Sequence, residues 1–366
     1  MNKMDFQLSD THINISFGST WKKFYYIWLR DNCRCQKCYS TIYNQLLHAI
    51  FDIPLTIKPE NCEIVNGILK ITWEGGHQSE YLITWLENID FECKSKLEVT
   101  LWDHDTIINS LDDLTVPLDE YFGENGVKTL VGKILKYGFA FVSGVDKTLT
   151  ATEKVVKHLA VIQKTSFGEM WYVNYDHNDS SSSNISLLPH NDNTYYSNPA
   201  GLQVFNLIMH DGDGGETILV DGFKLADIVK NKSFKAFRTL CEVPVEAHYI
   251  DKDQHFIFTE PILKLHPVTK ELYRVRFNIY DRGPLTSVKD DAILRFYEAL
   301  ELFGKEVSDE KNQYTFKLPS NTIIFIDNWR VLHGRTGFNG KRNLGGCYVG
   351  RDDFISVAKR FFPHIQ

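Results

Sequence analysis

Residues 323–335 read IIFIDNWRVLHGR, and this stretch decides what fold to expect. Four consecutive apolar residues, all Ile or Phe, are typical of a strand that is buried on both faces. The polar residues Asp327 and Asn328 end this strand, and His333 follows between an apolar neighbour and a glycine. Because an imidazole held rigidly beside a buried strand can ligate a metal, the stretch predicts a strand-built scaffold with a metal-ligating histidine.

Strand signals also dominate the rest of the second half of the chain. Runs of β-branched and aromatic residues predict a hairpin at 67–81 and strands at 139–142, 202–209, 216–220, 272–277 and 345–349. Helical signals are confined to 127–137, to about 164 from a capping box at Thr150, to 223–240 and to 293–300. Many strands with few helices predict an α+β fold with a β sandwich or roll, and not a parallel sheet of βαβ units.

The composition is that of an ordinary globular protein. The chain has 366 residues, 43% hydrophobic and 24% charged, so two or three domains with a substantial core are expected. With 40 Lys and Arg against 47 Asp and Glu, the net charge of −7 argues against a nucleic acid as the main partner. No apolar run approaches the roughly 20 residues that span a bilayer, so no membrane partner is expected.

The start of the sequence, MNKMDFQLSD, bears on the cellular compartment. It has neither the apolar segment of a secretory signal nor the Arg-rich, acid-poor pattern of a mitochondrial presequence. The seven cysteines, an odd number in a long chain, fit a reducing compartment. A cytoplasmic location is therefore expected, with a mitochondrial one as the alternative.

Three of the seven cysteines, Cys33, Cys35 and Cys38, fall within six residues. Three thiolates at this spacing can occupy three corners of a zinc tetrahedron, which then needs one more nitrogen or sulfur ligand. His77 directly follows a Gly-Gly pair in the predicted hairpin, where a tight turn would present its imidazole, and His48 is the alternative. A Cys3His set without an open position predicts structural zinc; otherwise the three thiols are free in a loop.

A His-x-Asp pair with a second histidine far downstream is the sequence form of the 2-His-1-carboxylate site of non-haem iron enzymes. The chain has two such pairs, at 177–179 and at 190–192. The first lies in an Asn- and Ser-rich loop, whereas the second precedes a predicted strand that can hold its ligands rigidly. We therefore expect His190, Asp192 and His333 to bind Fe(II). On its own, a His-x-Asp pair is more often exposed and without a metal.

A basic residue lies where a chelating dicarboxylate needs an anchor for its far end. Arg342 enters the predicted strand after the second metal histidine, and its guanidinium can bind a carboxylate through two hydrogen bonds. Thr217, behind a Gly-Gly pair at the start of another predicted strand, offers a further hydroxyl. The alternative for Arg342 is a surface ion pair with an acid.

Several motifs make the chain similar to a known family over nearly its whole length. They are WLRDNCRCQKC at 28–38, PHNDNTYY at 189–196, GLQVFNL at 201–207, GGETILVDGF at 214–223, FIDNWRVLHGR at 325–335 and GKRNLGGCYVGRDD at 340–353. The chain resembles the Fe(II)/2-oxoglutarate dioxygenases of the trimethyllysine dioxygenase and γ-butyrobetaine hydroxylase family, within the taurine-dioxygenase-like group. FGEMW at 167–171, FNIYDRG at 277–283 and GCYVGRDD at 346–353 resemble the trimethyllysine dioxygenase branch.

This resemblance implies a small N-terminal zinc-binding β domain at 1–105 and a catalytic double-stranded β-helix, or jelly roll, at 115–366. It implies Fe(II) and structural Zn(II) on the ligands named above. It also implies 2-oxoglutarate as co-substrate on Arg342, with Thr217 assisting, and ascorbate as reductant. The expected partners are O2 and a small trimethylammonium substrate, and a homodimer is expected.

The implied reaction is hydroxylation of N6-trimethyllysine at C3 to 3-hydroxy-N6-trimethyllysine, in carnitine biosynthesis. One alternative is hydroxylation of γ-butyrobetaine to carnitine, and another is oxidation of a different small amine or sulfonate. A third, from another class of protein, is a non-catalytic scaffold stabilised by zinc.

A trimethylammonium group cannot donate hydrogen bonds, so an aromatic cage is expected to hold it by cation–π contacts. By resemblance, Trp171 is a cage tryptophan, Phe167 replaces a cage tyrosine and Asn278 contacts the polar end of the substrate. Two further cage tyrosines are replaced by Ser182 and Asn193. The neighbouring tyrosines that could compensate are Tyr172, Tyr175, Tyr195 and Tyr196.

Overall fold

The computed structural model describes residues 5–89, 91, 99–174 and 184–365, and the chain divides into two compact units, Met1–Cys93 and Lys94–Gln366. Strands predicted from the sequence are present in both units, and each unit has a hydrophobic core of its own. Within the described residues, no helix has the length and apolarity needed to cross a membrane.

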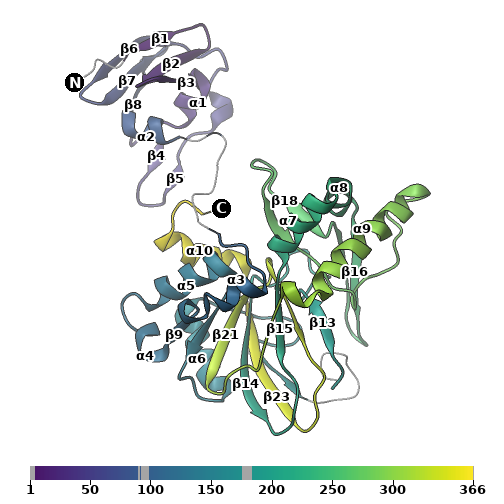
Figure 1. Ribbon diagram of the computed structural model, residues 1–366. Helices are drawn as coiled ribbons and strands as arrows, with labels where there is room; N and C mark the ends of the chain where they lie inside the picture. The colour runs from purple at the N-terminus through teal and green to yellow at the C-terminus, as the bar shows by residue number, and fades with distance from the viewer. Residues whose placement is uncertain (1–4, 90, 92–98, 175–183, 366) are drawn as a thin grey trace. The chain divides into compact units, whose positions relative to one another are not determined.

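The N-terminal unit consists of two three-stranded antiparallel sheets, one two-stranded sheet and short helices (Figure 1). Its elements are β1 (Phe6–Leu8), β2 (His12–Phe17), β3 (Thr20–Tyr25), α1 (Tyr26–Asp31), β4 (Tyr39–Ser40), β5 (Gln45–Leu46), η1 (Ile50–Asp52), β6 (Pro59–Val65), β7 (Ile68–Trp73), β8 (Gln78–Leu82) and α2 (Ile83–Asn88). Side chains of β2 and β7 are buried at every second position, which is the period of a strand with one face on a core. The predicted hairpin at 67–81 is confirmed by the pairing of β7 with β8.

Two sheets form the framework of the C-terminal unit. The larger has the order β11-β23-β14-β21-β10-β9, with β12 also on β23, and the smaller has the order β13-β22-β15-β20. Their strands are β9 (Thr115–Pro117), β10 (Phe139–Ser143), β11 (Ile162–Gln163), β12 (Met170–Asn174), β13 (Leu187–His190), β14 (Leu202–His210), β15 (Thr217–Asp221), β20 (Gln313–Phe316), β21 (Thr322–Asp327), β22 (Val331–Arg335) and β23 (Arg342–Val349). Apart from the β9–β10 pair, the pairings in both sheets are antiparallel, and the curled arrangement fits a jelly roll (Figure 1).

Helices and small hairpins complete the C-terminal unit. They are α3 (His104–Ile108), η2 (Leu111–Asp113), α4 (Leu118–Tyr121), α5 (Gly126–Tyr137), α6 (Leu149–Leu159), α7 (Gly222–Lys232), α8 (Phe234–Glu242), β16 (Val245–Ile250), β17 (His255–Glu260), β18 (Leu263–Leu265), β19 (Leu272–Val275), α9 (Asp291–Ser308), η3 (Glu310–Asn312) and α10 (Arg351–Phe361). The helices α7, α8 and α9 share one hydrophobic cluster, which also includes residues of β18 and β19.

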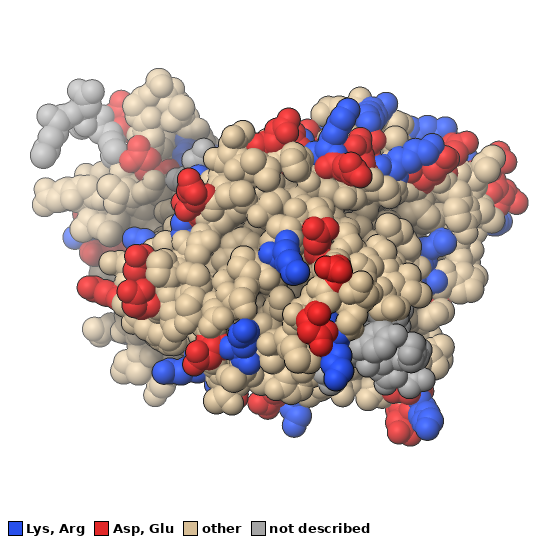
Figure 2. Space-filling model, turned by 60° about the horizontal axis from the view of Figure 1, so that its bottom comes forward, with Lys and Arg blue, Asp and Glu red and all other residues tan. Residues whose placement is uncertain are grey.

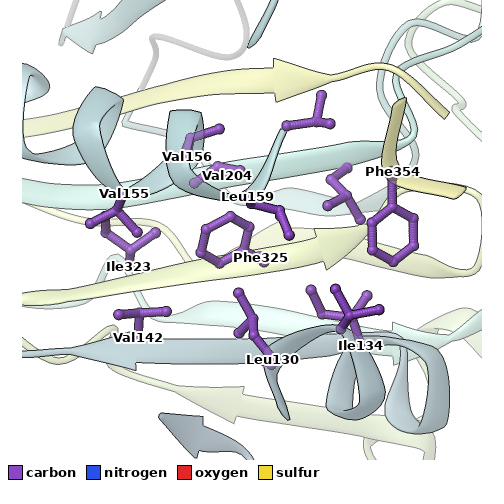
Figure 3. Packing of buried hydrophobic residues seen from close by; sticks show 14 of the residues in the cluster. Leu130, Ile134, Val142, Val155, Val156, Leu159, Val204, Ile323, Phe325 and Phe354 are labelled. Carbon is purple, nitrogen blue, oxygen red and sulfur yellow. The ribbon is translucent and has the colours of Figure 1, made fainter. Parts of the chain in front are cut away.

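The large sheet is packed between helices on one face and the site on the other. Leu130 and Ile134 of α5 and Val155 of α6 contact the apolar side chains of β10, β14 and β21, as Figure 3 shows. Phe325, from the stretch quoted first, lies in the middle of this cluster and is fully buried. The buried strand predicted at 323–326 is therefore confirmed, and it makes the sheet a rigid base for the loops at its end.

Some predicted elements have different limits in the structure. The predicted capping box at Thr150 is wrong, because α6 begins at Leu149 with Thr148 as its N-cap. This helix also ends at Leu159 and not near 164, since the next residues pair with β23 as strand β11. The helix predicted at 223–240 is two helices, separated where the Ser233 side chain accepts a hydrogen bond from the backbone N–H of Ala236.

The predicted N-terminal domain extends to residue 105, whereas the compact unit ends at Cys93. Trp102 accounts for the difference, because it is fully buried in the C-terminal unit. Its backbone N–H donates to Asp221 Oδ2 at 3.1 Å and its indole N–H to the Tyr137 carbonyl at 2.6 Å. This segment therefore belongs structurally to the C-terminal unit.

Charged side chains of both signs are interspersed on the face of the molecule in Figure 2, without a large area of one sign. A polyanion such as a nucleic acid binds through an extended basic surface. Among the described residues, the face in Figure 2 shows no such extended basic area.

Candidate active site

Three predicted metal ligands meet at one end of the smaller sheet. His190 ends β13 and is directly opposite His333 of β22 in the strand register, while Asp192 lies in the turn that follows β13. Asp192 Oδ1 is 3.5 Å from Nε2 of His190 and 3.5 Å from Nε2 of His333. The three ligand atoms lie within 4.8 Å of one another, so the structure brings the whole predicted triad together.

Hydrogen bonds hold these side chains in an orientation suited to a metal. His190 Nδ1 is 2.7 Å from the Leu188 carbonyl, so it carries the proton and leaves Nε2 free as a ligand. The Tyr348 hydroxyl donates to Asp192 Oδ2 at 2.8 Å, which leaves Oδ1 for the metal. His190 and Asp192 thus direct their unprotonated ligand atoms towards the common centre.

The turn that carries Asp192 is fixed by Asn328. The Asp192 backbone N–H donates to Asn328 Oδ1 at 2.8 Å, and Asn328 Nδ2 donates to the carbonyls of Asp192 and Ala200, both at 3.0 Å. Asn191 Nδ2 donates in turn to the Asn328 carbonyl at 2.8 Å. The polar end of the stretch at 323–335 therefore positions the ligands at 190–192.

Burial and charge act in opposite directions on the pKa values at this centre. Burial alone would raise the pKa of Asp192, but the imidazoles of His333 and His190 outweigh it and hold this pKa well below its usual range. Burial lowers the pKa of His333, so its neutral form, the one that ligates metals, is favoured. Two imidazoles and one carboxylate on one face are the donor set of non-haem Fe(II) sites, and the residues present fit that ion.

A cavity of about 450 Å³ opens at the three ligands. A cavity of this size suits a small molecule. Apart from the triad, its walls include Phe167, Trp171, Asn193, Tyr195, Phe205, Thr217, His248, Tyr249, Asn278, Tyr280, Asp281, Arg335, Arg342 and Tyr348. The residues expected to contact the substrate, including Trp171, Phe167 and Asn278, and both predicted co-substrate residues are among them.

Arg342 is buried in this wall, with 7% of its surface exposed. Burial, together with the nearby Arg335, lowers its pKa to about 10, and its Nε has no hydrogen-bond partner among the described residues. The space for this side chain depends on Gly215, where a Cβ would lie 3.3 Å from Arg342 Cδ and Nε. A buried guanidinium with an unused donor fits an anionic ligand such as a carboxylate.

Thr217 begins β15 and lines the same part of the cavity, opposite Arg335 of β22 in the strand register. Arg335 was not predicted from the sequence, although it ends the motif that contains His333. The end of the cavity that holds Arg335 and Arg342 is therefore cationic, which extends the predicted anchor for a dicarboxylate.

Aromatic rings form another wall of the cavity. The Trp171 ring lies 5.3 Å from that of Tyr348 and 5.7 Å from that of Phe205. Tyr195 lies 5.2 Å from Tyr249, whose ring is also 5.5 Å from Phe167. These spacings are typical of packed aromatic clusters, and their faces offer the π surface that a quaternary ammonium needs.

The two predicted amide residues lie close to the iron-ligand turn. Asn193 has a left-handed backbone with φ of 57° and directs Nδ2 to the Tyr195 hydroxyl at 3.5 Å. Asn278 Nδ2 donates to Asp281 Oδ2 at 2.8 Å and to the Asn191 carbonyl at 3.3 Å. Tyr348, Tyr249 and Asp281 were missed by the sequence reasoning, although Asp281 and Tyr348 lie within the quoted motifs FNIYDRG and GCYVGRDD.

The alternative His-x-Asp pair, His177 and Asp179, lies outside the described residues, as do Tyr175 and Ser182. The two tyrosines Tyr172 and Tyr196 are described, and their surroundings differ from each other. Tyr172 lines the cavity. Tyr196 packs on Tyr195 and Phe256, and its hydroxyl is 3.1 Å from Ser166 Oγ.

The cysteine cluster of the N-terminal unit converges on His77. The distances from His77 Nε2 to the sulfurs of Cys33, Cys35 and Cys38 are 3.5, 3.8 and 3.6 Å. Zn–S bonds of about 2.3 Å and a Zn–N bond of about 2.05 Å at a tetrahedral angle would place sulfur and nitrogen roughly 3.6 Å apart. The donor set therefore fits zinc.

The turn between β7 and β8 presents His77 to the cysteines. Gly75 and Gly76 both have positive φ, of 85° and 78°, which an L side chain rarely adopts. The alternative ligand His48 has other neighbours: its Nδ1 is 3.3 Å from the Cys38 carbonyl and its Nε2 is 3.7 Å from Asp31.

A curled antiparallel sheet that carries a His-x-Asp…His triad at the mouth of a cavity defines the class of non-haem iron oxygenases. Comparison with protein-family models agrees with this class. Residues 108–348 match the "Taurine catabolism dioxygenase TauD, TfdA family" and residues 5–87 match "Gamma-butyrobetaine hydroxylase-like, N-terminal".

Individual proteins extend the comparison. The chain is 35% identical to the mitochondrial trimethyllysine dioxygenase of Rattus norvegicus, over 96% of this chain and 85% of that protein. It is 26% identical to the γ-butyrobetaine dioxygenase of a Pseudomonas species, over 91% of this chain and 89% of that protein. A taurine dioxygenase structure from Burkholderia xenovorans matches with a TM-score of 0.50 and 15% identity, over 66% of this chain and 91% of that one. The chain belongs to the trimethyllysine dioxygenase family, within the TauD dioxygenases.

Proposed function

We propose that the protein is a 2-oxoglutarate-dependent dioxygenase that hydroxylates N6-trimethyllysine at C3, giving 3-hydroxy-N6-trimethyllysine for carnitine biosynthesis. The observation that carries this proposal is the 35% identity to trimethyllysine dioxygenase over 96% of the chain. A jelly-roll catalytic domain within Lys94–Gln366 and a zinc domain within Met1–Cys93 are part of the proposal. The aromatic and cationic walls of one cavity support it, because they suit the two chemically different molecules that this reaction joins.

His190, Asp192 and His333 would hold Fe(II) through the three atoms that converge in the structure. When bound, this ion supplies the activation of O2 that an unactivated C–H bond requires, and ascorbate would keep it reduced. Because the triad provides three ligands on one face, the opposite face stays open for the co-substrate and O2. The role of the protein is to position both organic molecules against that face.

Arg342 would bind the far carboxylate of 2-oxoglutarate through two parallel hydrogen bonds, and Thr217 would add a hydroxyl donor. Arg342 is buried, so water screens the charge of its guanidinium only weakly. Its attraction for a carboxylate is therefore strong. The cationic end of the cavity thereby places the oxidisable end of the co-substrate towards the triad.

Trp171, Phe167 and Tyr195 would enclose the trimethylammonium group, which can be recognised only by charge and shape. Asn193 and Asn278, which border the iron-ligand turn, would contact the polar end of the substrate. The aromatic rings and the amides would together hold the carbon chain beside the metal centre, so that one C–H bond is presented.

Cys33, Cys35, Cys38 and His77 would bind a structural Zn(II) with no open position. In a unit of under 100 residues such an ion contributes directly to folding.

The second candidate reaction is hydroxylation of γ-butyrobetaine, and the 26% identity to a γ-butyrobetaine dioxygenase is the observation that favours it. Oxidation of another small amine and a non-catalytic scaffold remain further alternatives. The test is a panel of trimethylammonium compounds incubated with Fe(II), ascorbate and 2-oxoglutarate, with succinate and a mass gain of about 16 Da as readouts, the mass of one inserted oxygen atom. A gain on trimethyllysine at C3 supports the proposal, a gain on γ-butyrobetaine alone supports the second candidate, and no stimulated succinate formation contradicts both.

The compartment and assembly belong to the same proposal. The name of the rat relative includes its mitochondrial location, which favours the mitochondrial alternative over the cytoplasmic expectation for this chain. Subcellular fractionation distinguishes the two. The expected homodimer is tested by light scattering of the purified protein.

A further inference from the structure

Asp281 is a carboxylate in the cavity wall that the proposed reaction does not yet use. The cavity lining contains only one other acidic residue among the described residues, Asp192, and its Oδ1 is directed to the metal position. Within the described part of the chain, no Lys, Arg or His nitrogen lies within 4.0 Å of the Asp281 carboxylate. An ionised carboxylate that is removed from water without a cationic partner is costly, so its presence in a binding cavity needs an explanation.

The structure holds this carboxylate in one orientation. Thr194 Oγ1 and Asn278 Nδ2 both donate to Asp281 Oδ2, at 3.0 and 2.8 Å. Oδ1 accepts no hydrogen bond from the described residues and is available to a further donor. Burial, together with the nearby charge of Asp192, raises the pKa of Asp281 to about 6, although the imidazoles of His190 and His248 act in the opposite direction.

The position of Asp281 relative to the iron ligands indicates which part of a substrate it faces. Thr194 lies two residues after Asp192, and Asn278 also donates to the carbonyl of Asn191, between the two ligands. The carboxylate is therefore joined by hydrogen bonds to both sides of the iron-ligand turn. A group that it binds would therefore lie on the side of the cavity next to the iron-ligand turn.

We propose that the Asp281 carboxylate binds the primary α-ammonium group of an amino-acid substrate and so selects amino acids over amino-group-free betaines. This inference rests on the proposed function. In trimethyllysine, the α-ammonium is on the carbon next to C3, the site of hydroxylation, whereas the quaternary nitrogen is at the far end of the side chain. A primary ammonium donates three hydrogen bonds and suits a carboxylate, while the quaternary group donates none and suits the aromatic wall.

The same residue would disfavour γ-butyrobetaine. That molecule has no primary ammonium, and its carboxylate is one methylene away from the carbon that would be hydroxylated. In the same pose, this carboxylate would face Asp281 without an intervening cation, and two like charges at short range repel. Asp281 thus provides both an attraction for one candidate substrate and a repulsion for the other, which is how specificity is commonly built.

The test compares Asp281→Asn with wild type on two ligands, N6-trimethyllysine and 6-(trimethylammonio)hexanoate, which has the same chain without the α-amino group. Binding to enzyme loaded with Fe(II) and 2-oxoglutarate is measured by anaerobic calorimetry, and KM and kcat are measured in air. We expect the Asp281→Asn affinity for trimethyllysine to fall roughly 10- to 100-fold, the range for a hydrogen bond to a charged group. The affinity for the hexanoate should stay the same or rise, because the repulsion between its carboxylate and Asp281 is removed. Glu246→Gln is the matched control, because it removes a carboxylate nearby on β16 that does not line the cavity.

The remaining outcomes would contradict either the ammonium assignment or the proposed function. Equal losses on both ligands would show that Asp281 only supports the fold of the site, and no loss on trimethyllysine would exclude it as the ammonium partner. Wild-type enzyme that turns over neither ligand, nor any other trimethylammonium compound, would contradict the proposed function itself. Wild-type enzyme that prefers trimethyllysine, together with an Asp281→Asn variant that retains the same preference, would contradict the ammonium assignment alone.

Discussion

At the scale of single residues, Tyr348 connects the metal centre with the aromatic wall. Its hydroxyl donates to Asp192 Oδ2 at 2.8 Å, while its ring lies 5.3 Å from that of Trp171. Gly346, two residues earlier on β23, makes room for the same tryptophan, since a Cβ there would lie 2.4 Å from Trp171 Cη2. The orientation of a metal ligand and the shape of the substrate wall thus depend on one strand.

The first prediction concerns the hydroxyl of Tyr348. Tyr348→Phe keeps the ring and removes the hydrogen bond to Asp192, so Fe(II) affinity is expected to fall about 10- to 100-fold, as for other residues that orient metal ligands. Fe(II) titration under anaerobic conditions measures it. Tyr314→Phe, at a buried tyrosine of another cluster, is the control and should leave the affinity unchanged. An unaltered affinity in Tyr348→Phe would exclude this role of the hydroxyl.

The second prediction concerns the co-substrate anchor. Arg342→Met removes the buried guanidinium but keeps an unbranched apolar side chain, and the KM for 2-oxoglutarate should rise roughly 10- to 100-fold, the range for a hydrogen bond to a charged group. Steady-state kinetics with varied 2-oxoglutarate measures this KM. Arg238→Met, at an exposed residue paired with Glu242 on α8, should not change it. Similar KM values for wild type and Arg342→Met would place the carboxylate elsewhere.

At the scale of elements, the sequence predicted those strands and turns whose formation depends on residues that are close together in the sequence. The strand at 323–326 and the hairpin at 67–81 follow from apolar runs and from a Gly-Gly turn, and both are present as predicted. The predicted C-terminal limit of α6 was wrong because it depends on β23, which lies almost 200 residues later and pairs with Ile162 and Gln163. Pairing over such separations leaves no signal in a short window of sequence.

The residues of the candidate active site also divide into those with a recognisable sequence signal and those without one. His190, Asp192 and His333 could be predicted because the donor set of an iron site has a recognisable spacing, and the structure brings them together. Asn328 and Tyr348 could not, since each acts through hydrogen bonds to Asp192 from strand ends more than 130 residues away. Residues that orient ligands are found only when the fold is known. Asn and Tyr are common residue types, and only their position in the folded structure shows that they contact a metal ligand.

The third prediction concerns α3, a five-residue helix that begins after Trp102. Asp103 is its N-cap and accepts hydrogen bonds from the Thr106 N–H at 3.0 Å and the Thr106 hydroxyl at 2.7 Å. Asp103→Ala should lower the free energy of unfolding of the C-terminal unit by about 1 kcal/mol at pH 7. Urea unfolding measures this change. Asp105→Ala, within the same helix, removes a carboxylate without removing the cap and should cost less.

The pH dependence of this effect has a defined sign. The hydrogen bond from the Thr106 hydroxyl, with help from Lys224, lowers the pKa of Asp103 below its usual value. A carboxyl with a lowered pKa in the folded state contributes stability above its unfolded pKa of about 3.9, and this contribution is lost as the pH falls. The difference between wild type and Asp103→Ala should therefore shrink below about pH 4. A difference that grows as the pH falls would contradict this assignment.

At the scale of the whole molecule, the two candidate metal sites belong to different compact units. All four zinc donors lie within Met1–Cys93, and all three iron donors lie within Lys94–Gln366. No residue is shared: His77 lies in the turn between β7 and β8 of one unit, and His190 and His333 lie on the paired strands β13 and β22 of the other. The zinc donors form a closed Cys3His set, whereas the iron donors border a cavity. One ion should therefore serve folding and the other chemistry, and each should be removable without the other.

The fourth prediction tests this separation with a reciprocal pair of variants. In Cys35→Ser, zinc content should fall from about one ion per chain towards zero, because a hydroxyl is a poor ligand for zinc beside two thiolates and an imidazole. The N-terminal unit should then unfold at a lower temperature and become sensitive to proteases, while Fe(II) still binds to the C-terminal unit. In His190→Ala, turnover should be lost while zinc content and the thermal transition of the N-terminal unit stay as in wild type. Elemental analysis, calorimetry and limited proteolysis measure these outcomes. Loss of Fe(II) binding in purified, folded Cys35→Ser, or loss of zinc in His190→Ala, would show that the two units depend on each other, because neither substitution touches a donor of the other site.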